Sequence, residues 1–269
     1  MHAFAFRTMK SPVLRIPKQF GALSLAAVAV MLSAHTAFAA GSREDRVPSL
    51  TELAPPVPSS QNAAPIYLRA FQLCPKDRNA SQLLSSFISS DGANAKAIVP
   101  KVRAALQKYE KALSLARRAA SMPHCRFPTN WQTADPAALR SPYYADLREL
   151  ARATAAHAKL CAMDGRAHEA AADLQASFRM AKHVGEDPVL ISVLVEYACI
   201  GIAGRALLGV LETSILSEKD IKKLDQTLAE MNLNGALVRA LQGELALSMQ
   251  TLRNTSSKQT SESICPGGG

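Results

Sequence analysis

The strongest constraint on the fold lies in residues 143–211, where apolar residues recur at helical spacing in three consecutive segments. A turn signal, Asp164-Gly165, separates the first segment from the second. The third segment, residues 188–211, is apolar nearly all round, which is typical of a helix that is buried on most sides. The pattern predicts that this third helix forms the centre of the core, with Leu194 buried in its middle.

The same spacing predicts shorter helices before and after this region, in a chain that is rich in alanine and has few β-branched runs. We therefore predict an all-α fold in which antiparallel helical hairpins surround the central apolar helix. The further expected helices cover residues 63–73, 81–89, 99–120, 221–231 and 237–252.

The apolar segment 189–211 is also long enough to span a membrane. Glu196 and Arg205 argue against that interpretation, because nine steps of about 100° place them on opposite sides of the helix, where they cannot pair. Unpaired charges in hydrocarbon are costly. The sequence therefore favours a core helix over a membrane span.

The two segments joined at Asp164-Gly165, with Ala170 five residues after the glycine, resemble a tetratricopeptide-type helical hairpin. The chain is also similar to a group of uncharacterised exported helical proteins from environmental bacteria, over residues 62–71, 150–184 and 187–195. This resemblance implies an exported helical protein and no particular activity. The hairpins are accordingly expected to form either a tetratricopeptide-like array or an irregular helical bundle.

Residues 1–39 have the pattern of a secretory signal peptide. Basic residues without any acid precede an apolar run at residues 20–34, and Ala37-Phe38-Ala39 follows as a cleavage site. Cleavage after Ala39 predicts a periplasmic or secreted protein. The alternative is an inner-membrane anchor formed by residues 20–34, although a span needs roughly twenty apolar residues. The sequence allows translation to start at Met1 or at Met9.

Composition divides the rest of the chain into three parts. Residues 40–61 are polar and contain four prolines, which predicts a flexible linker. Residues 62–253 contain the helical pattern and are long enough to bury the core of a single domain. Residues 254–269 are polar and end in three glycines, which predicts a disordered tail.

Charge and aromatic content bear on the kind of partner. Four of the 31 basic residues and none of the 22 acidic residues precede Ala40, so the mature chain would carry a net charge of +5 rather than +9. This moderate charge and an aromatic content of 5% give no indication of a nucleic-acid partner. The sequence contains no strong catalytic or cofactor motif, so we expect no cofactor and favour a protein that is not an enzyme.

Five cysteines in an exported chain leave at least one of them unpaired. Cys161 and Cys199 fall at apolar helix positions, where a free cysteine behaves as a small hydrophobic residue. Cys74 and Cys125 lie at or beyond expected helix ends, where the geometry of a bridge is easier to meet. We therefore predict a disulfide between Cys74 and Cys125, and an exposed thiol at Cys265 in the tail.

One group of residues has the chemistry of a metal site. His157 and Cys161 are four residues apart on one helix face, and His168 begins the next helix across the turn. These side chains suggest a zinc site with Asp164 as a further ligand, or else a core cysteine beside two histidines at the rim. Glu196 is a second unusual group, because a carboxyl in an apolar helix marks either a functional site or a structural hydrogen bond.

The segment 122–142 contains four prolines and no helical periodicity, which predicts a long loop. Four of the few aromatic residues lie in it or beside it, and large aromatic side chains are enriched in binding hot spots. They are candidates for a binding surface, and the alternative is that they staple the loop onto the helices. The four residues are Phe127, Trp131, Tyr143 and Tyr144.

Three hypotheses for function remain open at this point. The first is an exported helical domain that binds an unidentified protein or peptide partner in the cell envelope. The second is an enzyme or metal-binding protein that uses Glu196 or the group His157, Cys161 and His168. The third is a membrane-associated envelope component, in which an uncleaved N-terminal segment alone contacts the membrane.

Overall fold

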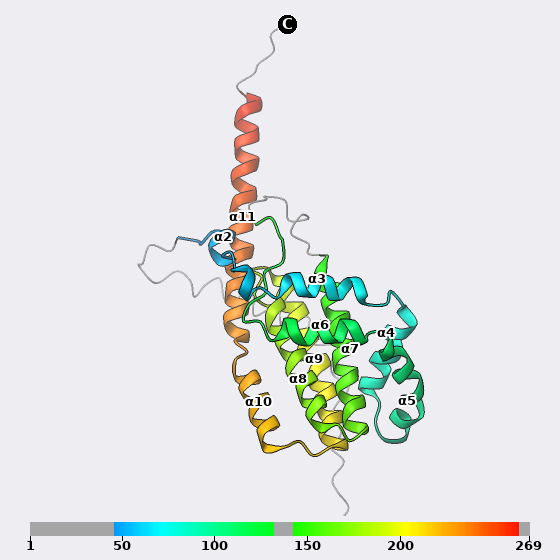
Figure 1. Ribbon diagram of the computed structural model, residues 1–269. Coiled ribbons are helices and arrows are strands. Elements are labelled where there is room, and N and C mark those ends of the chain that lie inside the picture. Colours follow the sequence, from blue (N-terminus) through cyan, green and yellow to red (C-terminus); the bar gives the residue numbers. More distant parts are fainter. Residues whose placement is uncertain (1–45, 132–141, 264–269) are drawn as a thin grey trace, which may run out of the picture. The chain divides into compact units, whose positions relative to one another are not determined.

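The computed structural model describes residues 46–131 and 142–263, and Figure 1 shows that helices dominate them. Within these ranges the regular structure is helical, apart from an isolated bridge between Asn62 and His124. The predicted all-α class is confirmed. The predicted signal peptide, residues 1–39, lies outside the described residues, as does Cys265.

Three long helices form the centre of the unit that begins at Val47. They are α7 (Tyr143–Met163), α8 (Ala167–Val184) and α9 (Leu190–Thr213), and they lie side by side in Figure 1. Each of the three packs against the other two. Small buried side chains allow α7 to approach its neighbours closely; they are Ala151, Ala153, Ala155, Ala156, Ala158 and Ala162.

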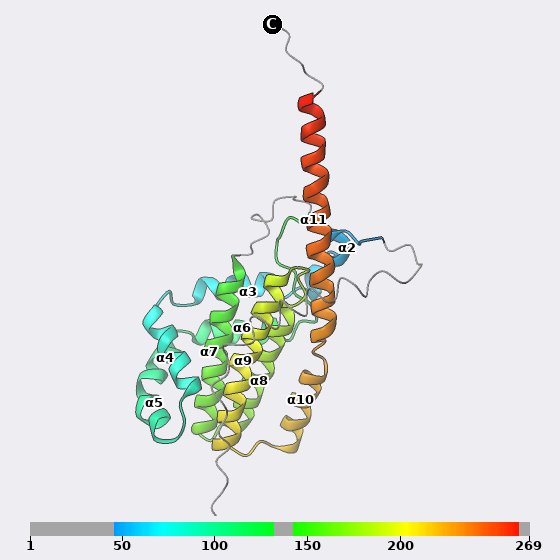
Figure 2. The ribbon, with the colours of Figure 1, turned by 180° about the vertical axis from the view of Figure 1, so that it is seen from behind.

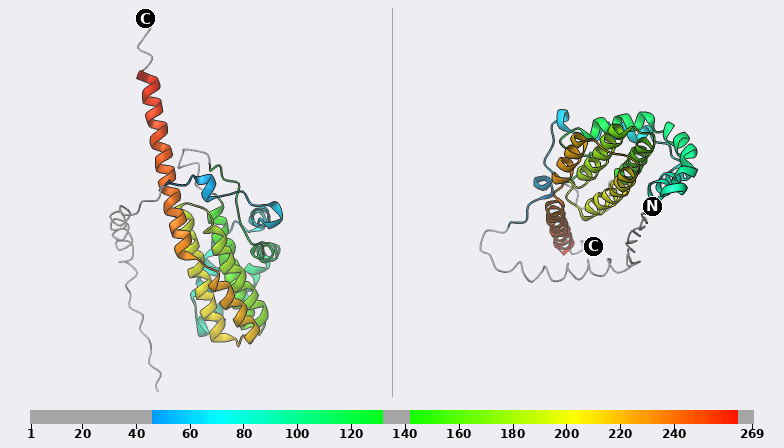
Figure 3. Two further views of the ribbon diagram at one scale, coloured as in Figure 1. Left: turned by 90° about the vertical axis from the view of Figure 1, so that its left-hand side faces the viewer. Right: turned by 90° about the horizontal axis from the view of Figure 1, so that it is seen from below.

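Shorter helices surround this centre. α3 (Ala64–Leu73) and α6 (Glu110–Ala120) pack against each other and against α7, and α6 also contacts α8. α4 (Arg78–Ser89) and α5 (Gly92–Gln107) lie at one edge of the three helices. α10 (Glu218–Ala229) and α11 (Leu233–Ser263) lie at the opposite edge, as the end-on view in Figure 3 shows.

The single helix expected over residues 99–120 is wrong, because α5 ends at Gln107 and α6 begins at Glu110. Pro100 is inside α5 rather than in a first turn. Tyr109, between the two helices, is fully buried and donates its hydroxyl to Glu149 Oε1 at 3.0 Å. The chain turns there because the tyrosine ring is held in the core.

The expected boundaries of the domain also change at both ends. Residues 46–61 are not wholly a linker, since they form α2 (Leu50–Leu53) and the 3₁₀ turn η1 (Ser59–Gln61). Ser49 and Glu52 form a capping box that starts α2, and Leu50 is buried. At the other end α11 continues to Ser263, because no glycine or proline follows Gly243 in it.

The expectation that α9 is buried on most sides is wrong. Leu194 is 62% exposed and Leu208 is 63% exposed, whereas the opposite face contacts α7 and α8. Figure 2 shows α9 from behind, where no described helix lies over this outer face. Among the described residues, α9 is the helix whose length and apolar composition would allow it to cross a membrane.

Candidate functional site

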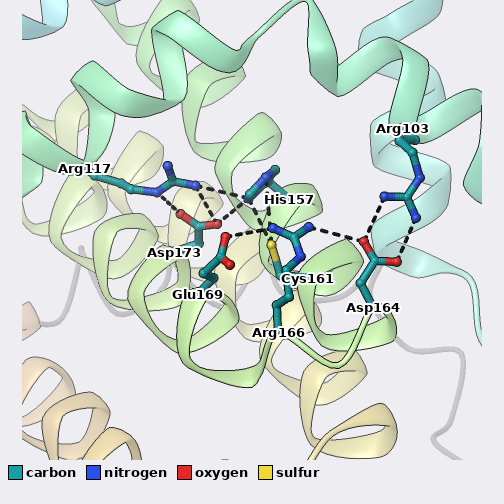
Figure 4. Close-up of polar contacts among 8 residues, drawn as sticks. All are labelled: Arg103, Arg117, His157, Cys161, Asp164, Arg166, Glu169 and Asp173. Atoms are coloured by element: carbon teal, nitrogen blue, oxygen red, sulfur yellow. Dashed lines mark hydrogen bonds and ion pairs between the residues drawn. The ribbon is translucent and has the colours of Figure 1, made fainter.

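Helices α7 and α8 bring three potential metal ligands together in a group that we call the His157 cluster: His157, Cys161 and Asp173. His157 and Cys161 lie one turn apart on α7, and Asp173 faces them from α8 (Figure 4). Their ligand atoms all lie within 4.8 Å of one another. Cys161 and Asp173 are buried, and His157 is half-buried.

The contacts of the His157 cluster converge on one ring nitrogen. His157 Nδ1 lies 2.5 Å from Asp173 Oδ2 and 3.4 Å from Cys161 Sγ. Arg117, from α6, donates from Nε to Asp173 Oδ1 at 2.5 Å and from Nη2 to Oδ2 at 3.1 Å. The same Nη2 lies 3.2 Å from His157 Nδ1 (Figure 4). A carboxylate, a thiol and a guanidinium therefore all face one nitrogen.

The charges in the cluster follow from these contacts. The hydrogen bond to Asp173 raises the pKa of Arg117, so the guanidinium stays charged. Burial raises the pKa of the Cys161 thiol to about 12, and the nearby Asp173 carboxylate adds to this effect. The thiol is thus protonated at neutral pH, which disfavours a role as a nucleophile.

A pocket of about 340 Å³ opens beside the His157 cluster, and His157, Arg117, Arg103 and Arg166 line part of it. Arg103 binds Asp164 through both terminal nitrogens, at 2.9 and 2.7 Å. Arg166 donates to Asp164 as well, and its other terminal nitrogen reaches Glu169 on α8 (Figure 4). Carboxylates therefore balance much of the arginine charge around the opening.

His168 is not part of this cluster. Its side chain is largely exposed, and its Nδ1 lies 2.8 Å from Asp220 Oδ1 on α10. Asp164, expected as a further ligand, binds arginines instead. The structure supplies Asp173 as the third group. His157 precedes Gly165 by eight residues, and Asp173 follows it by eight. Two antiparallel helices joined at this turn therefore bring His157 and Asp173 to the same level, which the sequence could have indicated.

A second polar site lies where α2 and η1 approach the α8–α9 turn and α11. It is a cleft of about 780 Å³, which we call the Glu196 cleft. The charged residues along it carry both signs. They include Glu52, Arg126, Lys182, Glu186, Glu196, Glu230 and Arg239.

Glu196 is the unusual group of this cleft. It is 2% exposed, and its Oε2 has no hydrogen-bond partner among the described residues. Burial raises the pKa of its carboxyl to about 7, and the positive charge of Arg239 opposes the shift. Gly185 packs directly on this carboxylate, and a Cβ at Gly185 would overlap it. The glycine thus makes room for the acid at the edge of the cleft.

The guanidinium of Arg239 lies on the same side of the cleft. Its Nη2 donates to the carbonyl oxygen of Gly185 at 3.1 Å, while its buried Nε has no partner in the described part of the chain. The Nε of Arg126 is likewise buried and unpaired there. The residues that line the cleft therefore contain one buried acceptor atom and two buried donor atoms without partners in the described ranges.

The four aromatic candidates are packed into the protein. Phe127 and Tyr144 are buried, and Tyr143 stacks on Phe127 with ring centroids 4.9 Å apart. Tyr144 donates its hydroxyl to Asp187 Oδ2 at 3.0 Å. Trp131 is 7% exposed and belongs to a small core cluster with Leu50, Ala54, Val189 and Leu247. These contacts favour the alternative in which the aromatic side chains staple the loop onto the helices. Residues 132–141 of the loop lie outside the described ranges.

The predicted disulfide between Cys74 and Cys125 does not form, and both thiols are free and buried. Cys74 caps the C-terminal end of α3, whereas the residue before Cys125 hydrogen-bonds to Ala63 at the other end. A helix of ten residues is about 15 Å long, while a bridge needs Cα atoms within about 7 Å. Cys161 and Cys199 are buried as well, and neither forms a disulfide within the described residues.

The two sites differ in what they offer. The His157 cluster brings nitrogen, sulfur and oxygen ligands together beside a small pocket. The Glu196 cleft is larger, and residues along it contain buried hydrogen-bonding atoms that have no partner among the described residues. No protein-family model, curated protein or solved structure matches the chain.

Proposed function

We propose that this protein is an exported helical domain that binds a peptide segment of a partner protein in the Glu196 cleft. The observation that carries the proposal is the buried Glu196 carboxylate beside a cleft of about 780 Å³, since its Oε2 has no hydrogen-bond partner in residues 46–131 and 142–263. That volume lies within the usual range of ligand sites, and buried polar atoms without partners are rare in folded proteins.

The chemistry of the cleft suits a peptide backbone. Each peptide unit offers one N–H donor and one C=O acceptor. Within the described part of the chain, Glu196 Oε2 is an unpaired acceptor suited to an N–H group, and the unpaired Nε atoms of Arg126 and Arg239 are donors suited to carbonyl oxygens. Pro55, Pro56 and Pro58 lie along the cleft and restrict that wall, since proline fixes φ. A stiff wall lowers the entropy lost when a ligand binds.

The cellular setting of the proposal comes from the sequence. The basic, apolar and Ala37-Phe38-Ala39 order of residues 1–39 supports export, and a partner in the cell envelope follows from that setting. The moderate charge of the mature chain supports no nucleic-acid partner.

Retention of peptides by the immobilised protein tests this function. The probe is a library of random hexapeptides, and mass spectrometry identifies those that are retained. Wild type should enrich a defined subset. Glu196→Gln should reduce the retention of that subset at least tenfold, because the amide replaces one acceptor oxygen with an N–H donor. Gly185→Val should have the same effect, because a Cβ at this position would overlap the Glu196 carboxylate and displace it.

Glu230→Gln is the matched control. Glu230 also lines the cleft, but it is half exposed and forms an ion pair with Lys182 at 3.2 Å. Exposed pairs of this kind contribute little energy, so this variant should retain the same peptides as wild type within about a factor of two. Equal retention by wild type and folded Glu196→Gln would overturn the proposed function.

A further inference from the structure

We propose that His157, Cys161 and Asp173 form a binding site for a divalent cation of the zinc type. The proposal does not depend on the Glu196 cleft, which other residues line. It rests on the geometry of the His157 cluster, where one ligand atom from each side chain lies within 4.8 Å of the others. Neighbouring turns of α7 and the facing turn of α8 supply the ligands.

The three side chains of the His157 cluster can all donate electron pairs to one cation. His157 Nδ1 lies 2.5 Å from Asp173 Oδ2 and 3.4 Å from Cys161 Sγ. When Nδ1 carries no proton, the neutral imidazole, the carboxylate and the thiolate are all electron-pair donors.

The separation of His157 and Cys161 already suits tetrahedral coordination. Zinc lies about 2.3 Å from sulfur and about 2.0 Å from nitrogen, which places those two ligands roughly 3.5 Å apart in a tetrahedron. Cys161 Sγ is 3.4 Å from His157 Nδ1, close to that separation. Asp173 Oδ2 would have to withdraw from His157 Nδ1 by somewhat less than 1 Å to leave room for the metal.

The ligand set identifies the class of metal. Imidazole and thiolate favour zinc, cobalt and related ions over magnesium and calcium, which prefer oxygen ligands. Three protein ligands leave a fourth coordination position, and the pocket of about 340 Å³ beside His157 gives it access to water. When the metal–sulfur bond forms, the Cys161 thiol loses its proton to solvent, so binding releases one proton from this residue.

Arg117 contacts two of the three proposed ligands. Its Nη2 lies within 3.2 Å of both His157 Nδ1 and Asp173 Oδ2, the two atoms that the metal would bind. Its side chain is partly exposed and lines the pocket, so it has room to move away. Because its positive charge repels a cation, we infer that Arg117 weakens metal binding.

Titration with Co²⁺ tests the site directly. The full chain is reduced, treated with a chelator and then titrated, with absorption spectroscopy as the readout. We expect one equivalent to bind and to give a thiolate-to-metal band in the near ultraviolet, together with the visible bands of a tetrahedral ion. Cys161→Ser should abolish the thiolate band, and His157→Gln should weaken binding at least tenfold.

Two controls separate this site from other thiols and histidines. Cys199→Ser changes a buried cysteine outside the cluster, and His168→Ala changes the histidine that pairs with Asp220, so both should bind Co²⁺ as wild type does. Asp173→Asn tests the third ligand, and circular dichroism establishes that it folds. Absence of stoichiometric binding to folded wild type, or an unchanged thiolate band in folded Cys161→Ser, would overturn the proposal.

Arg117→Gln tests the inferred competition. It removes the positive charge and leaves the three ligands in place, so it should bind Co²⁺ at least tenfold more tightly than wild type. An affinity equal to or below that of wild type would show that Arg117 does not compete with the metal.

Discussion

Helices α7 and α9 lie side by side, yet the helix with the more apolar sequence is the less buried of the two. α9 is the more apolar helix, but Leu194 and Leu208 on its outer face are largely exposed. α7 contains several charged residues, but most of its length is buried between α8, α9 and the shorter helices. Apolar content therefore did not identify the most buried helix. The small side chains of α7, which let neighbours approach from several directions, are the better indicator.

The polar groups of the two helices also differ in how they are satisfied. Lys159 of α7 is buried, and its Nζ donates to the carbonyl oxygens of Phe87 at 2.8 Å and of Ser90, at the end of α4. Helix ends leave such carbonyls without intrahelical partners, so the lysine caps α4. Glu196 of α9 has no such partner for its Oε2 among the described residues. The satisfied group acts as a structural element, whereas the unsatisfied one is the group on which the proposed peptide site rests.

The claim that α7 is more buried than α9 is tested most strongly at Leu150, which is fully buried on α7. Leu150→Asp should lower the free energy of unfolding by more than about 4 kcal/mol, because it places an unpaired charge in the core. Chemical denaturation monitored by circular dichroism measures the loss. A stability within about 1 kcal/mol of wild type would show that α7 is not the buried centre.

A second test is the pH dependence of stability that the buried His183 of α8 causes. His183 is buried; its Nδ1 lies 2.9 Å from the hydroxyl of Tyr67 and its Nε2 lies 3.1 Å from the carbonyl oxygen of Met122. Burial lowers the pKa of His183 from 6.5 to about 4. Between these values the unfolded chain binds the extra proton, so stability falls as pH decreases from about 6.5 to 4.

The loss attributable to His183 should be about 3 kcal/mol over that range. Asp187 and Glu196 shift stability the other way, because burial raises the pKa of each carboxyl, to about 6 and about 7. The difference between wild type and His183→Gln at each pH isolates the histidine. Parallel pH profiles of the two proteins would contradict the buried, neutral state of His183.

Much of the fold could be predicted from local patterns. Periodicity placed α7, α8 and α9 to within a few residues of their observed bounds, because an apolar face and a turn signal are both local. The break between α5 and α6 was missed, since it depends on the burial of Tyr109 against other helices. The exposed face of α9 was missed for the same reason: the sequence of one helix does not show how many neighbours surround it.

The candidate sites were predicted only in part. Spacing along one helix correctly paired His157 with Cys161, whose Nδ1 and Sγ atoms lie 3.4 Å apart. The choice of His168 as a third ligand was wrong, because it depended on how α8 faces α7. Glu196 stood out because it interrupts an apolar helix, although its cleft requires α2 and α11 to be in place. The predicted disulfide was wrong because Cys74 lies at the C-terminal end of α3, whereas the residue before Cys125 contacts Ala63 at the N-terminal end. The sequence places both cysteines near helix ends but does not show that these ends are far apart. Export, partner and metal remain predictions.

The smallest effect on stability is expected on the outer face of α9. Leu194, in the middle of the apolar α9, is 62% exposed, so Leu194→Asp should change the free energy of unfolding by no more than about 0.5 kcal/mol. The sequence alone led to the opposite expectation, that a charge at this position would be buried. Chemical denaturation under the conditions used for Leu150→Asp measures the difference. Val193→Asp is the matched control, because Val193 is buried one residue away and contacts Ala236 and Ala240. A large loss at Val193 with almost none at Leu194 would confirm a half-exposed helix; a loss of several kcal/mol at both would mean that α9 is covered in solution.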